Sequence, residues 1–255
     1  MAELLSLEGM EKGYARGSEW VPVLSDVSLE VIRGEIVAVV GGRLEGKTTL
    51  LKIAAGMEQA DHGTISLEGC ALPDLVDRPR EVRWIGRDGP GLEVQVSEFV
   101  GWPLARGGRG RRRAEAAARQ MLERVGALEC LDLHWSQLSN RQRVLVGLAQ
   151  VFLGNPKVIV IDDLLDALGE PTTEEVSDLL RALVDQGEPR CGVLMSVSDL
   201  ESAMFADRVL AITGKRSLKL LSGRLTDEGE VIPLHRRAMR SHIQSMPACY
   251  TMAML

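Results

Sequence analysis

The pattern Gly-x-x-x-x-Gly-Lys-Thr, which runs from Gly41 to Thr48, constrains the fold of this chain more than any other feature. It follows an apolar, β-branched run at residues 35–40 and leads into residues 48–55, whose apolar spacing is typical of a helix. A strand, a glycine-rich loop and a helix in this order form a P-loop. Backbone N–H groups and the helix N-terminus then hold phosphate oxygens. The motif therefore predicts a nucleotide site.

The loop and the start of the following helix supply the candidate contacts to nucleotide. The ammonium group of Lys47 is expected to reach the β- and γ-phosphates, and the hydroxyl group of Thr48 to hold a magnesium ion. The candidate contacts are Gly41, Gly42, Gly46, Lys47, Thr48 and Thr49. The expected ligands are ATP and Mg²⁺.

A second apolar strand, at residues 157–161, ends in Asp162 and Asp163. An acidic residue at the end of a strand beside the P-loop strand is suited to hold the magnesium ion. We therefore expect Thr48 and Asp162 to be the metal ligands.

Strands and helices alternate along the chain, which predicts a mostly parallel sheet covered on both faces. Strands are expected at residues 4–7, 21–31, 63–72 (as a strand or hairpin), 82–85, 157–161 and 192–197, and helices at residues 48–55, 114–125, 142–153, 172–184 and 200–205. Residues 107–113, GGRGRRR, are expected to form a flexible basic link.

Composition narrows the class of protein. The net charge of −6 argues against a chain whose main partner is nucleic acid. No apolar run reaches the ~18 residues of a membrane-spanning helix, and the start of the chain does not read as a secretion signal, so any membrane connection is expected to go through a partner. The four cysteines form no CxxC pair and are expected to be reduced thiols: Cys70, Cys130, Cys191 and Cys249.

Over about residues 4–221, the sequence resembles the ATP-binding subunits of ABC transporters. The order and spacing of several stretches carry the resemblance, among them VLSDVSLEVIRGEIVAVVG before the P-loop, AAGMEQADHGTISLEG after it, and LSNRQRVLVGLAQVFLGNPKVIVIDD. The stretches VSEFVGWPL and YARGSEWVPVL are most similar to the lipoprotein-release and macrolide-export branch.

The resemblance implies an α/β P-loop NTPase fold: a RecA-like core with an antiparallel β subdomain, and an α-helical signature subdomain at about residues 94–150. The cassette would occupy residues 1–223 and a C-terminal appendage residues 224–255. Tyr14 falls where the family stacks adenine on an aromatic ring. Ser139 and Gln142 belong to the signature, which in the family contacts the nucleotide held by a partner chain.

The resemblance also implies partners. They are a second nucleotide-binding subunit, in a homo- or heterodimer with ATP between one chain's P-loop and the other's signature, and a membrane permease. The chain would then be cytoplasmic, on the inner face of the cell membrane.

Several residues depart from the family pattern in the P-loop and the signature. Leu44 replaces a third glycine, which would cost about 1–2 kcal/mol if the backbone there needs a positive φ. Glu45 places a carboxylate beside the phosphate site. Asn140 and Arg141 replace the two signature glycines, which allow close approach to the γ-phosphate.

The catalytic positions depart as well. Asp163 falls on the catalytic glutamate, one methylene shorter, and a general base must come within ~3 Å of its water. Arg87 replaces the Q-loop glutamine, and Ser198 replaces the switch histidine. Gly169 replaces the D-loop aspartate. Binding residues therefore remain, whereas those that drive hydrolysis are changed, and weak hydrolysis is expected.

Other interpretations remain open. The chain is either an energising subunit with weak hydrolysis or a non-hydrolysing structural or regulatory subunit paired with a competent homologue. A soluble ABC protein of DNA repair or translation fits the acidic charge and the single cassette less well. At individual positions, Tyr14 could serve packing and Ser139 could cap a helix.

Overall fold

The computed structural model describes residues 3–72, 81–86, 89–108, 110–169, 172–187, 190–212, 218–222, 224–225 and 231–232. Its centre is a six-stranded sheet in the order β10-β9-β3-β8-β7-β6. These strands are β3 (Ile36–Val40), β6 (Val82–Ile85), β7 (Val158–Ile161), β8 (Gly192–Val197), β9 (Arg208–Ile212) and β10 (Leu218–Ser222). Strands β9, β3, β8, β7 and β6 pair in parallel, and β10 pairs antiparallel to β9 at the edge.

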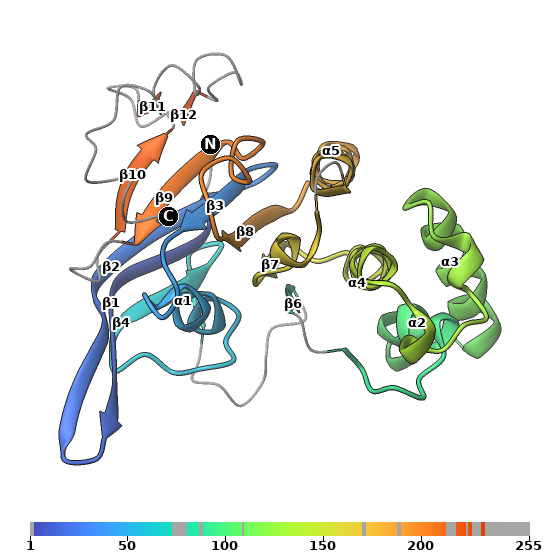
Figure 1. Ribbon diagram of the computed structural model, residues 1–255, viewed down its shortest axis with the longest axis horizontal. Coiled ribbons are helices and arrows are strands. Elements are labelled where there is room, and N and C mark those ends of the chain that lie inside the picture. The colour runs from blue at the N-terminus through green and yellow to red at the C-terminus, as the bar shows by residue number, and fades with distance from the viewer. Residues whose placement is uncertain are drawn as a thin grey trace.

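A second, antiparallel sheet has the order β2-β1-β4-β5. Its strands are β1 (Glu3–Arg16), β2 (Glu19–Ile32), β4 (His62–Leu67) and β5 (Cys70–Ala71). Helix α1 (Lys47–Ala54) lies between the two sheets (Figure 1). The apolar side chains of α1 share one buried cluster with inward residues of both sheets, so this helix joins the antiparallel sheet to the core. Two short strands, β11 (Arg224–Leu225) and β12 (Val231–Ile232), pair with each other.

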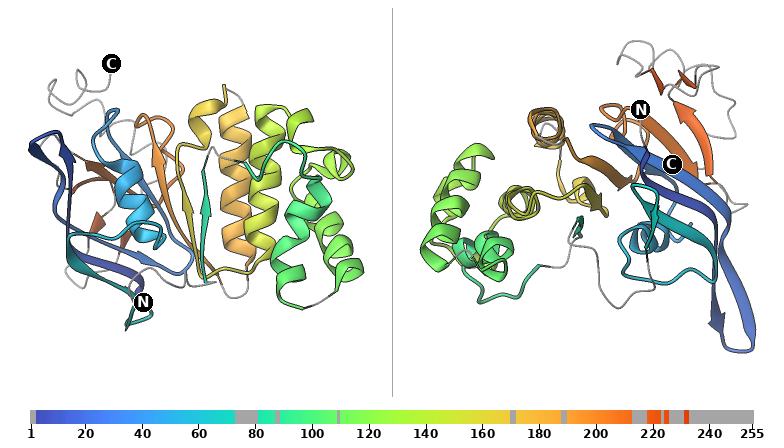
Figure 2. Two further views of the ribbon diagram at one scale, coloured as in Figure 1. Left: turned by 90° about the horizontal axis from the view of Figure 1, so that it is seen from below. Right: turned by 180° about the vertical axis from the view of Figure 1, so that it is seen from behind.

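The other face of the parallel sheet carries a helical layer. Helices α4 (Asn140–Leu153) and α5 (Thr172–Gln186) lie side by side against it, and α2 (Val96–Arg106) and α3 (Arg111–Arg124) pack on the far side of α4 (Figures 1 and 2). Three 3₁₀ turns connect these elements: η1 (Leu128–Cys130), η2 (Trp135–Gln137) and η3 (Leu165–Ala167). A second buried apolar cluster fills this layer.

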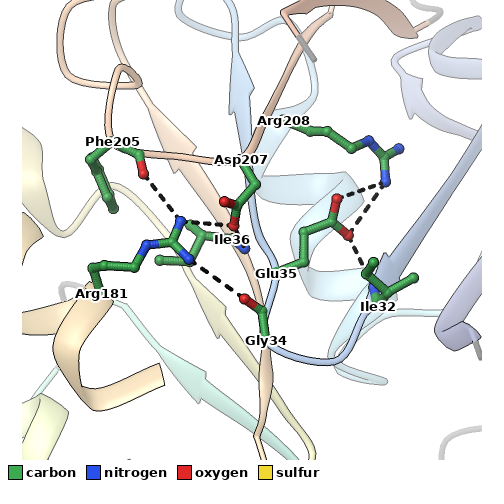
Figure 3. A network of polar contacts seen from close by, with 8 residues as sticks. All are labelled: Ile32, Gly34, Glu35, Ile36, Arg181, Phe205, Asp207 and Arg208. Carbon is green, nitrogen blue, oxygen red and sulfur yellow. Dashed lines mark hydrogen bonds and ion pairs between the residues drawn. The ribbon is translucent and has the colours of Figure 1, made fainter. Parts of the chain in front are cut away.

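Two sets of polar contacts join the N-terminal ends of the parallel strands β3 and β9 (Figure 3). The P-loop follows the opposite, C-terminal end of β3. Arg181 of α5 donates to a carboxylate oxygen of Asp207 at 2.7 Å, and Asp207 accepts the backbone N–H of Ile36 at 2.8 Å. Arg208 donates to the buried carboxylate of Glu35 at 3.2 and 3.4 Å. The first contact connects the helical layer to strands β3 and β9, and the second connects β9 to the start of β3.

The expected fold class is confirmed, and two local expectations are wrong. Residues 200–205 form turns instead of an α-helix, because their backbone bonds run from residue i+3 to residue i, as from Ala203 N to Leu200 O at 3.2 Å. The segment is also too short for a stable helix. Helix α3 begins at Arg111 and so includes residues 111–113 of the expected basic link. Ion pairs of Arg111 with Glu98 and Glu115 stabilise this first turn. Residues 63–72 form the hairpin β4–β5, which turns at Glu68 with φ 50°.

Candidate nucleotide-binding site

The P-loop connects the end of β3 to the start of α1. Gly46 is the N-cap residue of α1 and has a φ of 99°, which an L-residue rarely adopts. A Cβ at this position would also lie 3.0 Å from the backbone oxygen of Val23. The backbone oxygen of Gly46 then accepts the N–H of Leu50 at 2.9 Å, which begins the helix. Glycine is therefore required at this point for the loop to turn into the helix.

The ammonium group of Lys47 lies inside the loop. It donates to the backbone oxygens of Gly41 at 2.6 Å and Gly42 at 3.3 Å, and the residue is only 9% exposed. Among the described residues, no carboxylate lies within 4.0 Å of this nitrogen. A largely buried cation beside carbonyl oxygens provides a strong site for an anion such as a phosphate.

Thr48 and Asp162 face each other across the sheet edge. The hydroxyl of Thr48 donates to Asp162 at 3.2 Å, and Asp162 is 9% exposed. Burial raises the pKa of the Asp162 carboxyl, while hydrogen bonds from Ser196 and Thr48 act in the opposite direction. A buried carboxylate beside a hydroxyl fits a hard divalent cation, because such ions prefer oxygen ligands. The two expected metal ligands are thus brought together.

Asp163, the expected catalytic residue, directly follows Asp162. Its φ is 48°, and its backbone N–H donates to the hydroxyl oxygen of Ser196 at 2.8 Å. The Ser196 hydroxyl lies 2.9 Å from a carboxylate oxygen of Asp162 and 3.1 Å from one of Asp163. Ser196 is not among the residues that the sequence predicts for this site. A single serine within the apolar strand GVLMSV, beside two acids, is the signal that could have revealed it.

Two residues of the P-loop, Leu44 and Glu45, depart from the family pattern, and each affects the structure of the loop. Leu44 has a φ of 68° and is 91% exposed, so a residue with a Cβ occupies the left-handed region without burying its side chain. Glu45 turns its carboxylate back onto the loop, where it accepts the backbone N–H of Gly42 at 2.5 Å. The loop thus carries a carboxylate on one of its own N–H groups.

Tyr14 lies beside the first turn of α1. Its hydroxyl is 3.2 Å from that of Thr49 and also donates to Glu58, and the residue is 40% exposed. Burial, followed by the hydrogen bond to Glu58, raises the pKa of this phenol. The ammonium group of Lys12 lies 5.6 Å from the ring centroid. An aromatic ring next to the P-loop helix is compatible with the stacking role expected for Tyr14.

Ser139 and Gln142 form the N-terminal cap of α4. The backbone N–H of Gln142 donates to the Ser139 hydroxyl oxygen at 3.3 Å, and the Gln142 side chain accepts the N–H of Ser139 at 3.0 Å. Helix α4 and helix α1 lie on opposite faces of the parallel sheet (Figure 1). Ser139 and Gln142 therefore stand apart from the chain's own P-loop.

Arg141 and Ser198, two further departures from the family pattern, make side-chain or backbone contacts within the chain. The guanidinium group of Arg141 donates to the carboxylate of Glu175 at 2.5 and 3.2 Å. The backbone N–H of Ser198 donates to Asp166 at 3.2 Å, and its hydroxyl donates to the neighbouring Asp199. Gly169 follows η3 at the end of a described segment, and Arg87 lies outside the described residues.

The central strand that ends in a P-loop, the Thr48–Asp162 pair and the helical layer define this protein as a P-loop nucleotide-binding cassette. Similar folds are known: a structure described as the dimeric structure of MJ0796, a bacterial ABC transporter cassette, superposes with a TM-score of 0.77 at 23% identity, covering 87% of this chain and all of that one.

Sequence comparisons specify the family. Residues 24–166 match the ABC transporter family. The lipoprotein-releasing system ATP-binding protein LolD 2 of Caulobacter vibrioides is 31% identical over 219 residues, which cover 82% of this chain and 94% of the relative. The macrolide export ATP-binding/permease protein MacB of Salmonella paratyphi A is 31% identical over 83% of this chain, which spans 33% of that longer relative. The chain belongs to the ABC transporter family, as an ATP-binding subunit.

These findings confirm the resemblance to the lipoprotein-release and macrolide-export branch. In the described part of the chain, no helix is long and apolar enough to span a bilayer.

Proposed function

We propose that this chain is a subunit in which ATP closes a dimer of cassettes and thereby drives a separate membrane permease, and that it hydrolyses ATP weakly. The observation that carries the proposal is the contrast between two parts of one site. The ammonium group of Lys47 lies inside the loop, where it can bind phosphate. Asp163, in contrast, is held by hydrogen bonds within its own chain. Binding is supported more strongly than catalysis.

Mg²⁺ fits the Thr48–Asp162 pair, for which we propose the role of metal ligands. The ion would neutralise charge on the phosphate oxygens when bound. The chain itself supplies a hydroxyl oxygen, from Thr48, and a buried carboxylate, from Asp162, for the ion.

Weak hydrolysis follows from the residues near the carboxylate pair. Asp163 is a short side chain for a general base, which must reach its water within ~3 Å. Ser198 directs its hydroxyl to Asp199 at 3.1 Å and has no ionisable group for the γ-phosphate. We therefore expect bound ATP to be long-lived.

The relatives support the proposed partners. MacB is named as an ATP-binding/permease protein, and MJ0796 is described as dimeric. A cavity of about 420 Å³ opens between the end of β6 and helices α2 and α4; its lining includes Trp84, Phe99, Trp135 and Arg143. The buried Nε of Arg143 has no hydrogen-bond partner among the described residues. We propose that a short segment of the permease occupies this cavity and holds the chain on the cytoplasmic face of the membrane.

One contact favours a second candidate, a non-hydrolysing subunit paired with a competent homologue. Arg141 occupies the place of a signature glycine and is already paired with Glu175. For this side chain to contact a partner's nucleotide, the ion pair would have to break. A homodimer would carry this obstacle at both nucleotide sites, whereas a heterodimer would carry it at one.

Calorimetric titration with ATP and Mg²⁺, with phosphate release followed in the same sample, tests the proposal. Binding with very slow release supports it, and complete absence of release favours the second candidate. Steady release at rates typical of transport ATPases would contradict weak hydrolysis. Absence of binding would remove the function altogether. Asp163→Glu alone is expected to leave release slow, because Ser198 and Arg141 remain.

A further inference from the structure

The side chain of Ser196 lies between the two acids that end strand β7. It is fully buried, and its oxygen accepts the backbone N–H of Asp163 at 2.8 Å. Its single hydroxyl hydrogen faces two acceptors, Asp162 at 2.9 Å and Asp163 at 3.1 Å. One hydroxyl therefore holds the backbone of Asp163 and is within bonding distance of both carboxylates.

We propose that Ser196 is a positioning residue that keeps the Asp163 carboxylate against the sheet and so slows hydrolysis of bound ATP. The inference rests on the proposed function and gives a cause for its weak hydrolysis. A carboxylate oxygen 3.1 Å from a fully buried atom is directed toward the interior, away from the solvent side where the attacking water must lie.

The backbone conformation supports the same arrangement. Asp163 has a φ of 48°, which costs an L-residue conformational energy unless neighbouring contacts maintain it. The N–H···Oγ bond to Ser196 is such a contact. Main chain and side chain of Asp163 are thus both contacted from strand β8, and removal of the hydroxyl would remove both of these contacts.

The test compares phosphate release in single-turnover reactions, with saturating ATP and Mg²⁺, for the Asp163→Glu chain and the Asp163→Glu/Ser196→Ala chain. The longer glutamate supplies reach, and the alanine removes the restraint. We expect about tenfold faster release in the double variant, with the ATP dissociation constant changed by less than about threefold. Ser196→Thr in the same background keeps the hydroxyl and is expected to release phosphate at the rate of Asp163→Glu.

Ser177→Ala is the matched control. Ser177 is also a buried serine, but its hydroxyl donates to the backbone of Thr173 within α5. Added to the Asp163→Glu chain or to the double variant, Ser177→Ala should not change the rate of phosphate release. A general loosening of the fold would instead affect all the variants. Equal release from Asp163→Glu and from the double variant, with ATP bound to both, overturns the inference alone. Failure of every chain to bind ATP overturns the proposed function as well.

Discussion

The carboxylate of Glu45 accepts a hydrogen bond from the backbone N–H of Gly42, at 2.5 Å, within the loop that holds phosphate in P-loop proteins. The same carboxylate packs against the start of the loop, since a Cβ at Gly41 would lie 3.0 Å from it. The loop therefore contains a negative charge of its own before any nucleotide arrives.

Glu45→Gln is expected to strengthen ATP binding. The substitution keeps the shape of the side chain and removes repulsion of the triphosphate, which we put at about 1–2 kcal/mol, or roughly 5–30-fold in affinity. Because the effect is electrostatic, it should shrink as salt is raised. Calorimetry at two ionic strengths measures it. Glu19→Gln removes an exposed carboxylate elsewhere and serves as the control. Unchanged affinity in Glu45→Gln would show that the carboxylate moves away without cost.

Lys47→Ala is expected to abolish measurable ATP binding. The ammonium group is the cation inside the loop, and alanine leaves the phosphates without it. Lys52→Ala, at the end of the same helix, removes an equal charge outside the loop and should bind like the unmodified chain. Titration calorimetry compares the two, with circular dichroism to verify folding. Retained affinity in a folded Lys47→Ala chain would exclude the loop as the ATP site.

Leu44→Gly is expected to stabilise the fold by about 0.5–1 kcal/mol. Relief of left-handed strain, about 1–2 kcal/mol, exceeds the entropy that glycine adds to the unfolded chain, about 0.5–1 kcal/mol. Little packing is lost, since Leu44 is 91% exposed. Leu92 is 65% exposed and has no positive φ. Leu92→Gly is therefore expected to destabilise the fold, because glycine adds entropy to the unfolded chain and relieves no strain. Urea unfolding measures the free energy of unfolding of both variants. Equal destabilisation by the two substitutions would mean that Leu44 is not strained.

The sequence predicted those features that depend on local pattern. The P-loop is specified within eight positions, and the strands around it are short β-branched runs, so both were found without tertiary information. At Leu44 the family pattern raised a positive φ only as a condition, and the structure gives a φ of 68° there.

Features that depend on contacts distant in sequence were not predicted. Ser196 lies 33 residues beyond Asp163, and only the parallel pairing of β7 with β8 brings the two together. The sequence places Arg141 at a signature glycine, but it does not predict the ion pair with Glu175, which helix α5 brings beside it. Residues 200–205 have helical composition, but their backbone hydrogen bonds run from residue i+3 to residue i, as in turns.

Buried thiols give a prediction that depends on pH. Burial raises the pKa of the Cys130 and Cys191 thiols to about 11, so about one in a thousand is thiolate at pH 8. In a Cys249→Ser chain, iodoacetamide at pH 8 should modify exposed Cys70 alone, and labelling of the other two should require unfolding or a pH near 11. Mass spectrometry of the labelled peptides identifies the sites. Rapid labelling of Cys191 in the folded chain would contradict its burial.

Arg181→Met is expected to cost about 2–4 kcal/mol of unfolding free energy. The guanidinium group bridges Asp207 to the backbone oxygens of Phe205 and Gly34, and its side chain is only 26% exposed (Figure 3). Methionine preserves much of the packing but leaves a poorly solvated carboxylate with the N–H of Ile36 as its remaining partner in this network.

Two further variants separate charge from geometry in this network. Arg181→Lys keeps the charge but cannot reach three acceptors with a planar fork, so it should fall between the unmodified chain and Arg181→Met. Arg124→Met removes an exposed arginine that contacts Gln186 and should change stability by less than about 0.5 kcal/mol. Urea unfolding of the three variants measures the order. If Arg181→Met costs no more than Arg124→Met, the network does not join α5 to the sheet, and apolar packing alone holds that helix in place.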